Sequence, residues 1–184
     1  MGETMSKDKN IQVVNIVVST SLEHDIPLEK MAATLSNTEY NPEQFPGLVI
    51  RIREPKTSAL IFSSGKVVCT GARSMEKVQE SIEKIIKALK KIGIEITIKP
   101  KISIQNIVAS GSVGMDLNLN VLAMKLENTE YEPEQFPGLV YKLDEAKATF
   151  LLFSNGKIVC TGTKSEDEVH EALDKLIVNL KKVS

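Results

Sequence analysis

Two hydrophobic periods alternate along the chain and divide it into predicted strands and helices. Apolar residues recur at every second position, or run continuously with β-branched side chains, in four segments of the first half: 11–19, 47–54, 57–63 and 66–73. Helical spacing replaces this pattern from Pro27 to Asn37 and again over 75–92, where Ser74 is suited to cap the helix. The proline-containing stretch TEYNPEQFPG predicts a protruding loop that begins with a short strand.

The same order of elements returns 91 residues later without an insertion. Residues 37–50, NTEYNPEQFPGLVI, correspond to residues 128–141, NTEYEPEQFPGLVY. Residues 64–71, SGKVVCTG, correspond to residues 155–162, NGKIVCTG. Aligning 11–93 with 102–184 gives 41 identities in 83 positions. We therefore expect a flexible tail at 1–10 and two repeats, 11–93 and 94–184, related by pseudo-symmetry.

Each repeat reads as strand, helix, three or four antiparallel strands and a long helix, which is an α+β arrangement with helices on one face of a sheet. The opposite face is left uncovered, because no sequence remains to form a third layer. Its alternation predicts an apolar surface with paired Asn and Thr residues and a basic fringe, and such a surface is typical of an interaction site. These positions are Asn15, Val17, Val49, Arg51, Leu60, Phe62, Val68 and Thr70, with repeat mates Asn106, Val108, Val140, Lys142, Leu151, Phe153, Val159 and Thr161.

Charge and composition argue against several classes of function. The net charge of −1 argues against a binder that relies on charge alone. Neither a signal-peptide pattern nor a transmembrane run is found, which favours a soluble intracellular protein. His24 and His170 are not repeat mates, and no phosphate loop or metal-ligand spacing occurs, so we expect no enzyme activity, metal or cofactor. Cys69 and Cys160 are expected to be buried thiols.

Four of the five phenylalanines fall at repeat-matched positions, two in the loops and two on the uncovered face. Paired at the two ends of a symmetric surface, they have the character of wedges that enter between base pairs. The alternative is that they are core aromatics. The four are Phe45, Phe62, Phe136 and Phe153.

Over 11–184 the sequence resembles the TATA-binding proteins, general transcription initiation factors, and within them the archaeal branch. The motifs that carry the resemblance are NIVVS and NIVAS, the two EQFPGLV segments, RIREPKT at 51–57 and the two GK-V-CTG segments. The resemblance implies a saddle-shaped, ten-stranded curved antiparallel sheet with four helices on its convex face. It also implies binding to the minor groove of A·T-rich TATA elements with wedge insertion and bending, the recognised mechanism of this family.

The resemblance assigns roles to individual residues. It places Asn15 and Asn106 at central base edges, flanks the wedges with Leu60 and Leu151, and has Arg51 and Lys142 meet phosphate. The resemblance and the alternation pattern together predict which residues contact the groove: Asn15, Val17, Val49, Leu60, Val68, Thr70, Asn106, Val108, Val140, Leu151, Val159 and Thr161. Six exposed cations are expected at phosphates: Arg51, Arg53, Lys66, Arg73, Lys142 and Lys157. Asp144 replaces Arg53 in the second repeat, which leaves phosphate contact open there.

Partners also follow from the resemblance. The second loop would dock transcription factor B, bring in RNA polymerase indirectly and nucleate the preinitiation complex. Our hypothesis is that the acidic run Glu130, Glu132 and Glu134 attracts this partner, and the alternative is that these acids only keep the loop solvated. Cytoplasmic, nucleoid-associated localisation is expected, and whether the free protein dimerises through its apolar face stays open. Two other readings of the residues remain: a module that binds an apolar ligand on the uncovered face, and a nucleic-acid enzyme on the same duplicated fold.

Overall fold

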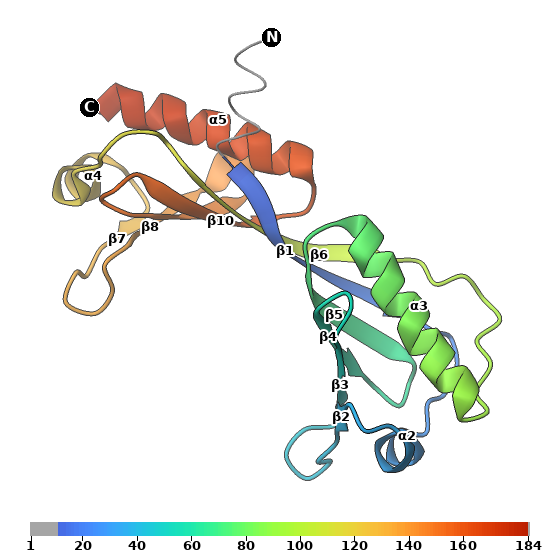
Figure 1. The fold of residues 1–184 in the computed structure, drawn as a ribbon. Coiled ribbons are helices and arrows are strands. Elements are labelled where there is room, and N and C mark those ends of the chain that lie inside the picture. Colours follow the sequence, from blue (N-terminus) through green and yellow to red (C-terminus); the bar gives the residue numbers. More distant parts are fainter. Residues whose placement is uncertain (1–10, 184) are drawn as a thin grey trace. The chain divides into compact units, whose positions relative to one another are not determined.

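The computed structural model describes residues 11–183, so the tail expected at 1–10 lies outside the described residues. The described chain folds into ten strands, four α-helices and one 3-10 turn (Figure 1). In chain order they are β1 (Ile11–Ser21), α2 (Leu28–Thr34), β2 (Thr38–Glu39), β3 (Leu48–Ile52), β4 (Thr57–Ile61), β5 (Lys66–Ala72), α3 (Met75–Lys91), β6 (Ser103–Ser112), α4 (Leu119–Lys125), β7 (Thr129–Glu130), β8 (Leu139–Leu143), η1 (Asp144–Ala146), β9 (Ala148–Leu152), β10 (Lys157–Thr163) and α5 (Glu166–Val183).

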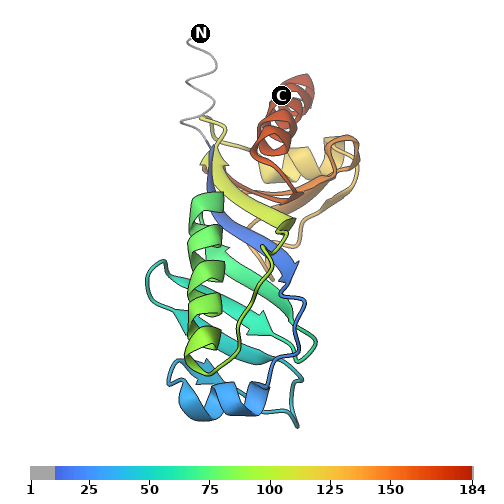
Figure 2. The ribbon, with the colours of Figure 1, turned by 90° about the vertical axis from the view of Figure 1, so that its right-hand side faces the viewer.

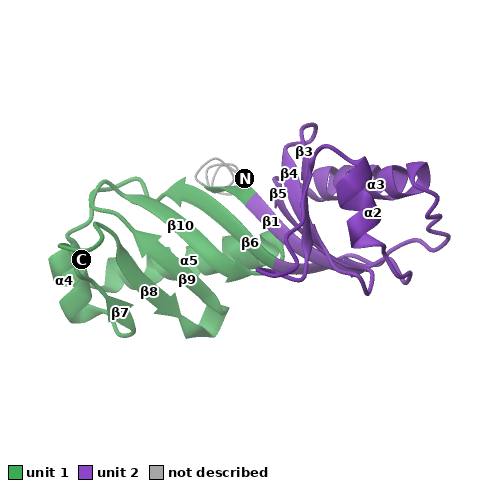
Figure 3. Ribbon diagram, turned by 90° about the horizontal axis from the view of Figure 1, so that it is seen from below, with its two compact units in different colours: residues 1–14, 106–184 green, residues 15–105 purple. Residues whose placement is uncertain are grey.

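The ten strands form one sheet in the order β2-β3-β4-β5-β1-β6-β10-β9-β8-β7. This confirms the prediction of an α+β fold with a ten-stranded antiparallel sheet and four helices. The chain divides into two compact units, one of residues 15–105 and the other of residues 1–14 and 106–184 (Figure 3). The first four residues of β1 thus belong to the unit that contains the second repeat.

In each unit the long helix covers one face of the strands. Figure 2 shows α3 lying lengthwise over the strands of residues 15–105. Its apolar stripe, which includes Val78, Ile82, Ile85 and Leu89, is buried, and in β1 Ile16 and Val18 face the same core. Ser74 accepts a hydrogen bond from the Lys77 N–H at 3.2 Å, which confirms the predicted N-cap.

Several helices and strands are shorter than predicted. Helix α2 ends at Thr34 and not at Asn37, because Leu35 has the extended backbone of a strand. Strand β3 ends at Ile52, before the Glu54-Pro55 turn, and β4 ends at Ile61. Phe62 therefore lies in the turn, where its N–H donates to the Lys66 carbonyl oxygen.

The helical spacing of apolar residues also predicts Ile86 and Ile177 on the inward faces of the long helices, and this prediction is wrong. Ile86 and Ile177 are only half-buried, whereas Ser81 and Ala172 are fully buried. Ser81 shares a 2.7 Å hydrogen bond with the buried Thr57 hydroxyl and donates to the Lys77 carbonyl oxygen at 3.0 Å. The second repeat fills the two equivalent positions with Ala148 and Ala172. The same core site is thus polar in one half and apolar in the other.

This difference predicts a coupled effect on stability. Thr57→Ala or Ser81→Ala alone should lower the free energy of unfolding by about 1 kcal/mol or more, because each removes one partner of a buried hydrogen bond. The double variant should cost less than the sum, since it reproduces the apolar pair of the second repeat. Chemical denaturation of the four proteins measures the coupling, and strictly additive losses would contradict it.

Candidate nucleic-acid interface

Within each unit, the described residues leave uncovered the face of the strands opposite the long helix. Paired strands place Val49, Leu60 and Val68 directly beside one another, and place Val140, Leu151 and Val159 in the same way in the second repeat. All six side chains are half-buried. The name open face is used for these six residues together with Asn15, Val17, Ser19, Arg51, Ser58 and Thr70 and their equivalents in the second repeat.

A second row of the open face is polar. Arg51 lies opposite Ser58, and Ser58 lies opposite Thr70. In the second repeat Lys142, Thr149 and Thr161 occupy the same places. Arg51 and Lys142 are exposed, and the others are half-buried. The open face therefore offers apolar surface with hydroxyl groups and a cation along one side.

Each repeat also carries an Asn–Thr pair, which joins β1 to β5 in the first repeat and β6 to β10 in the second. Asn15 Nδ2 donates to Thr70 Oγ1 at 3.1 Å, and Asn106 Nδ2 donates to Thr161 Oγ1 at 2.9 Å. Val17 and Val108, two residues further along the same strands, are half-buried beside them. The structure thus brings together the groove-binding residues predicted for each repeat.

Sequence reasoning missed several polar members of this face. Ser19 and Ser110 lie opposite Val68 and Val159 and extend the apolar rows, while Ser58 and Thr149 complete the polar rows. The Ser19 hydroxyl accepts a hydrogen bond from Gln105 Nε2 at 2.8 Å. Period-2 alternation from Asn15 and Asn106 would have found Ser19 and Ser110, and alternation from Leu60 and Leu151 would have found Ser58 and Thr149. Nothing local in the sequence indicates the Gln105 contact, which spans 86 residues.

The phenylalanines form two edge-to-face pairs. Phe45 and Phe62 have ring centroids 5.9 Å apart at 62°, and Phe136 and Phe153 are 5.9 Å apart at 68°. Phe45 and Phe136 are each 43% exposed, so neither is a core aromatic. A Cβ at Gly47 would lie 2.8 Å from the Phe45 ring, so glycine makes room for this pairing. Each loop tip therefore carries a ring braced by a second ring from the adjoining turn.

The loop backbone fixes the approach of these rings. In the first loop the Asn41 carbonyl oxygen accepts from the N–H groups of Gln44 and Phe45, both at 3.0 Å. In the second loop the Glu132 carbonyl oxygen accepts from Gln135 at 2.9 Å and Phe136 at 3.0 Å. The side chains of Glu130, Glu132 and Glu134 are exposed around this turn.

All six cations predicted to meet phosphate are exposed: Arg51, Arg53, Lys66, Arg73, Lys142 and Lys157. Arg51 Nη1 pairs with Glu39 Oε1 at 2.7 Å, with both side chains well exposed. At the position of Arg53 the second repeat presents Asp144, whose Oδ2 accepts from Asn128 Nδ2 at 3.3 Å. The two ends of the open face therefore differ in charge.

These cations predict the salt dependence of DNA binding. Six phosphate contacts at roughly 0.9 per contact give a log–log slope of about −5. Titrations of a short A·T-rich duplex between low and moderate salt measure it. A slope steeper than about −10 would show that charge, and not apolar contact, dominates the interaction.

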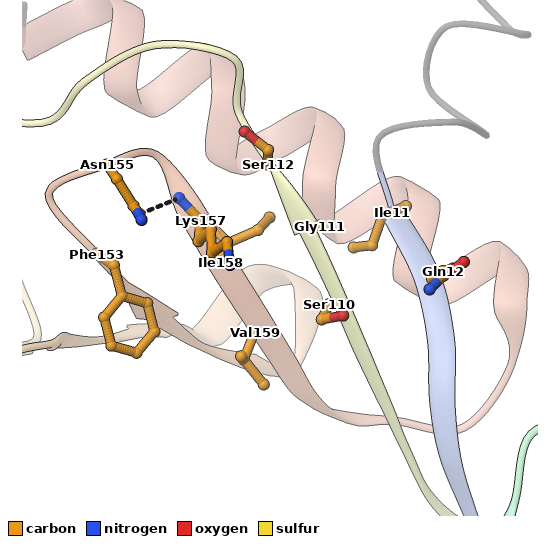
Figure 4. A pocket seen from close by; sticks show the side chains of 10 residues that line it. All are labelled: Ile11, Gln12, Ser110, Gly111, Ser112, Phe153, Asn155, Lys157, Ile158 and Val159. Carbon is orange, nitrogen blue, oxygen red and sulfur yellow. Dashed lines mark hydrogen bonds between the residues drawn. The ribbon is translucent and has the colours of Figure 1, made fainter.

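One hollow lies on this side of the second repeat, over β10 and β6 (Figure 4). Its volume is about 650 Å³, and Phe153, Val159, Ser110 and Lys157 are among the residues that line it. The Lys157 N–H donates to Asn155 Oδ1 at 3.0 Å and fixes the turn beside it. The hollow is open and shares its residues with the open face, so it is not the enclosed cavity that a small apolar ligand would occupy.

The two cysteine thiols are unreactive where the structure places them. Burial raises the pKa of the Cys160 thiol to about 11, and burial also raises the pKa of Cys69 against the opposing hydrogen bonds of Ser81 and Thr57. Both are buried free thiols, as predicted, and they stay protonated at neutral pH. Within residues 11–183, acidic, His and Cys side chains form no group able to hold a metal ion.

The fold and the open face define a class: a duplicated α+β protein in which one face of the strands is left uncovered by the helices. The family model for "Transcription factor TFIID (or TATA-binding protein, TBP)" matches residues 10–92 and 101–183. The chain belongs to the TATA-binding protein family, a non-enzymatic family of DNA-binding transcription factors. This confirms the predicted family and the prediction that the chain is not an enzyme.

Individual relatives are similar along almost their whole length. The TATA-box-binding proteins of Methanocaldococcus jannaschii and Picrophilus torridus are each 52% identical, over 176 and 181 residues. These alignments cover 96% of both chains in the first case, and 97% of this chain and 98% of the relative in the second. A solved structure, Methanococcus jannaschii TBP, is also 52% identical with a TM-score of 0.89, covering 95% of this chain and 99% of that one. No helix in the described part of the chain is long and apolar enough to cross a membrane.

Proposed function

We propose that the open face binds the minor groove of A·T-rich promoter DNA of the TATA type, and that the two Phe pairs kink the duplex. The observation that carries this proposal is that each repeat combines a half-buried apolar row, an Asn–Thr pair that supplies donors, and a partly exposed Phe pair. Family membership supplies the class of partner.

The chemistry of the open face fits an A·T minor groove. Edges of A·T pairs present only acceptors there, the adenine N3 and thymine O2, whereas a G·C pair adds the guanine amino donor. Asn15, Thr70 and their repeat mates supply donors, and the valine and leucine rows leave no acceptor for the amino group. The open face therefore favours A·T over G·C.

The wedges contribute less by themselves than full burial of four rings would imply. Full burial of a Phe is worth roughly 1.5–3 kcal/mol, but Phe45 and Phe136 are only 43% exposed. Burying that remainder yields about 1 kcal/mol per ring. Kinking costs a few kcal/mol per unstacked step, so the rest of the open face must contribute to offsetting the deformation.

In the cell, this binding would nucleate the preinitiation complex on the nucleoid. The exposed acidic loop at Glu130, Glu132 and Glu134 would recruit transcription factor B, a partner with a basic surface, and RNA polymerase would follow indirectly. The apolar area of the open face is also suited to a homodimer when DNA is absent, and sedimentation of the free protein tests that state.

A gel-shift titration on an A·T-rich duplex tests the proposed function. Binding should be lost when a small minor-groove ligand occupies the duplex first and should survive bulky substituents in the major groove. Binding that resists the minor-groove ligand but fails with the blocked major groove would overturn the proposal.

A further inference from the structure

The Asn–Thr pair of each repeat sits beside an irregularity in the sheet. Between β1 and β5 the register shifts, so that Thr70 and Gly71 together lie opposite Val17. Between β6 and β10 the same shift sets Thr161 and Gly162 opposite Val108. Two residues opposite one is a β-bulge, which takes a backbone N–H out of the ladder.

The N–H groups released by these bulges bind the asparagines. Gly71 N donates to Asn15 Oδ1 at 2.6 Å, and Gly162 N donates to Asn106 Oδ1 at 2.7 Å. Because a backbone N–H can only donate, the amide oxygen must face it, which settles the orientation of the Asn side chain. Nδ2 must then face Thr70 or Thr161 and the open face.

This orientation turns an amide donor, and not the amide oxygen, toward a partner. One Nδ2 hydrogen goes to the Thr hydroxyl oxygen, at 3.1 Å for Asn15, and the Thr70 hydroxyl can in turn donate to Asn15 Oδ1 at 3.3 Å. The second Nδ2 hydrogen is the donor that remains available. A flipped amide would instead present its oxygen, an acceptor that suits the guanine amino group. The bulge N–H thus selects the orientation suited to acceptor-only base edges.

Both bulges require glycine. Gly71 has φ +102° and Gly162 has φ +96°, in a region that is strained for residues with a Cβ. A Cβ on Gly71 would lie 3.2 Å from the Lys56 carbonyl oxygen, and one on Gly162 would lie 3.0 Å from that of Lys147. Both obstacles are backbone atoms, which cannot move aside as a flexible side chain can.

We propose that Gly71 and Gly162 are positioning residues for base discrimination, because their bulge N–H groups lock Asn15 and Asn106 with the donors facing DNA. The inference rests on the proposed minor-groove function. It adds that selectivity for A·T over G·C at the pairs beneath the asparagines depends on two backbone groups that do not themselves contact a base.

The hydrogen bond is tested first without DNA. In the free protein the Gly71 amide, although exposed, should exchange its hydrogen slowly, and Asn15→Ala should speed this exchange by about tenfold or more through loss of its acceptor. Asn106→Ala should act on Gly162 and leave Gly71 unchanged, so each repeat controls for the other. Equal exchange of Gly71 in the wild-type and Asn15→Ala proteins would overturn the inference.

Discrimination is tested next, as the ratio of dissociation constants for duplexes with G·C or A·T at the pairs beneath the asparagines. Gly71→Ala and Gly162→Ala should each lower this ratio by about tenfold, a loss within the range for one good base contact. Gly93→Ala and Gly114→Ala are matched controls. Their φ values are +89° and +76°, and no backbone atom lies within 4 Å of either added Cβ.

A further variant separates a loss of base discrimination from an effect of misfolding in the glycine variants. Asn15→Asp keeps an oxygen for the Gly71 N–H but loses the amide donors, so Gly71 exchange should stay slow while the discrimination ratio falls. A wild-type protein without any A·T preference would contradict the proposed function itself. A wild-type preference that Gly71→Ala and Asn15→Asp both retain in full would overturn only this inference.

Discussion

Replacing Phe136 and Phe153 together by alanine should straighten the bound duplex at one end and weaken binding by about 10- to 100-fold, from the loss of roughly 1.5–3 kcal/mol of apolar contact. The two rings act as a unit, because Phe153 braces Phe136 in an edge-to-face contact with centroids 5.9 Å apart. Fluorescence transfer between dyes at the duplex ends measures the bend. The end-to-end distance should increase relative to the wild-type complex.

The first repeat provides the mirror experiment, since Phe45→Ala with Phe62→Ala should relax the other end by a similar amount. Met124→Ala controls for the loss of an exposed apolar side chain, because Met124 is 78% exposed on α4, outside the open face. An unchanged end-to-end distance in both double-alanine complexes would refute the wedge mechanism.

The second large effect concerns the acidic loop. Glu132→Arg with Glu134→Arg should leave DNA binding intact and reduce recruitment of transcription factor B to the DNA complex by more than about tenfold, since two attractive charges become repulsive. The turn itself should persist, because it is held by the Glu132 carbonyl oxygen and not by the side chains. A gel shift with both proteins measures the ternary complex.

The repeat again supplies the control. Asn41 and Glu43 are the equivalents of Glu132 and Glu134 in the first loop, so Asn41→Arg with Glu43→Arg adds arginines to the same turn on the other repeat. We expect this variant to recruit the factor normally. If both double variants behave like the wild type, the acidic loop does not determine docking or the polarity of the complex.

Most of the fold could be predicted because the two halves of the chain have similar sequences. The constant offset of 91 residues aligned every strand and α-helix with a second copy, and alternation in β3, in β4 and in β5 as far as Thr70 correctly separated the buried residues from the others. The alternation failed at the bulge. Strict period 2 continued past Thr70 would place Ala72 on the open face, but the extra residue at Gly71 returns it to the core, where it is 1% exposed.

The functional details that escaped prediction depend on long-range contacts. The orientation of Asn15 is set by a backbone group 56 residues away, and the bracing of Phe45 by Phe62 depends on a loop folding back over a turn. Ser81 was overlooked because a polar residue inside an apolar helix stripe reads as solvent-facing until its partner Thr57 is known. Amino-acid composition and hydrophobic periodicity do not identify such long-range contact partners.

The most direct test of minor-groove recognition replaces the T·A pairs of the bound element by I·C pairs. This change preserves the acceptors and the absence of an amino group in the minor groove and alters the major groove. Binding affinity should stay within a few-fold of the A·T duplex and fall sharply with G·C pairs, which restore the guanine amino group. Loss of binding on the I·C duplex would show that the open face does not read the minor groove.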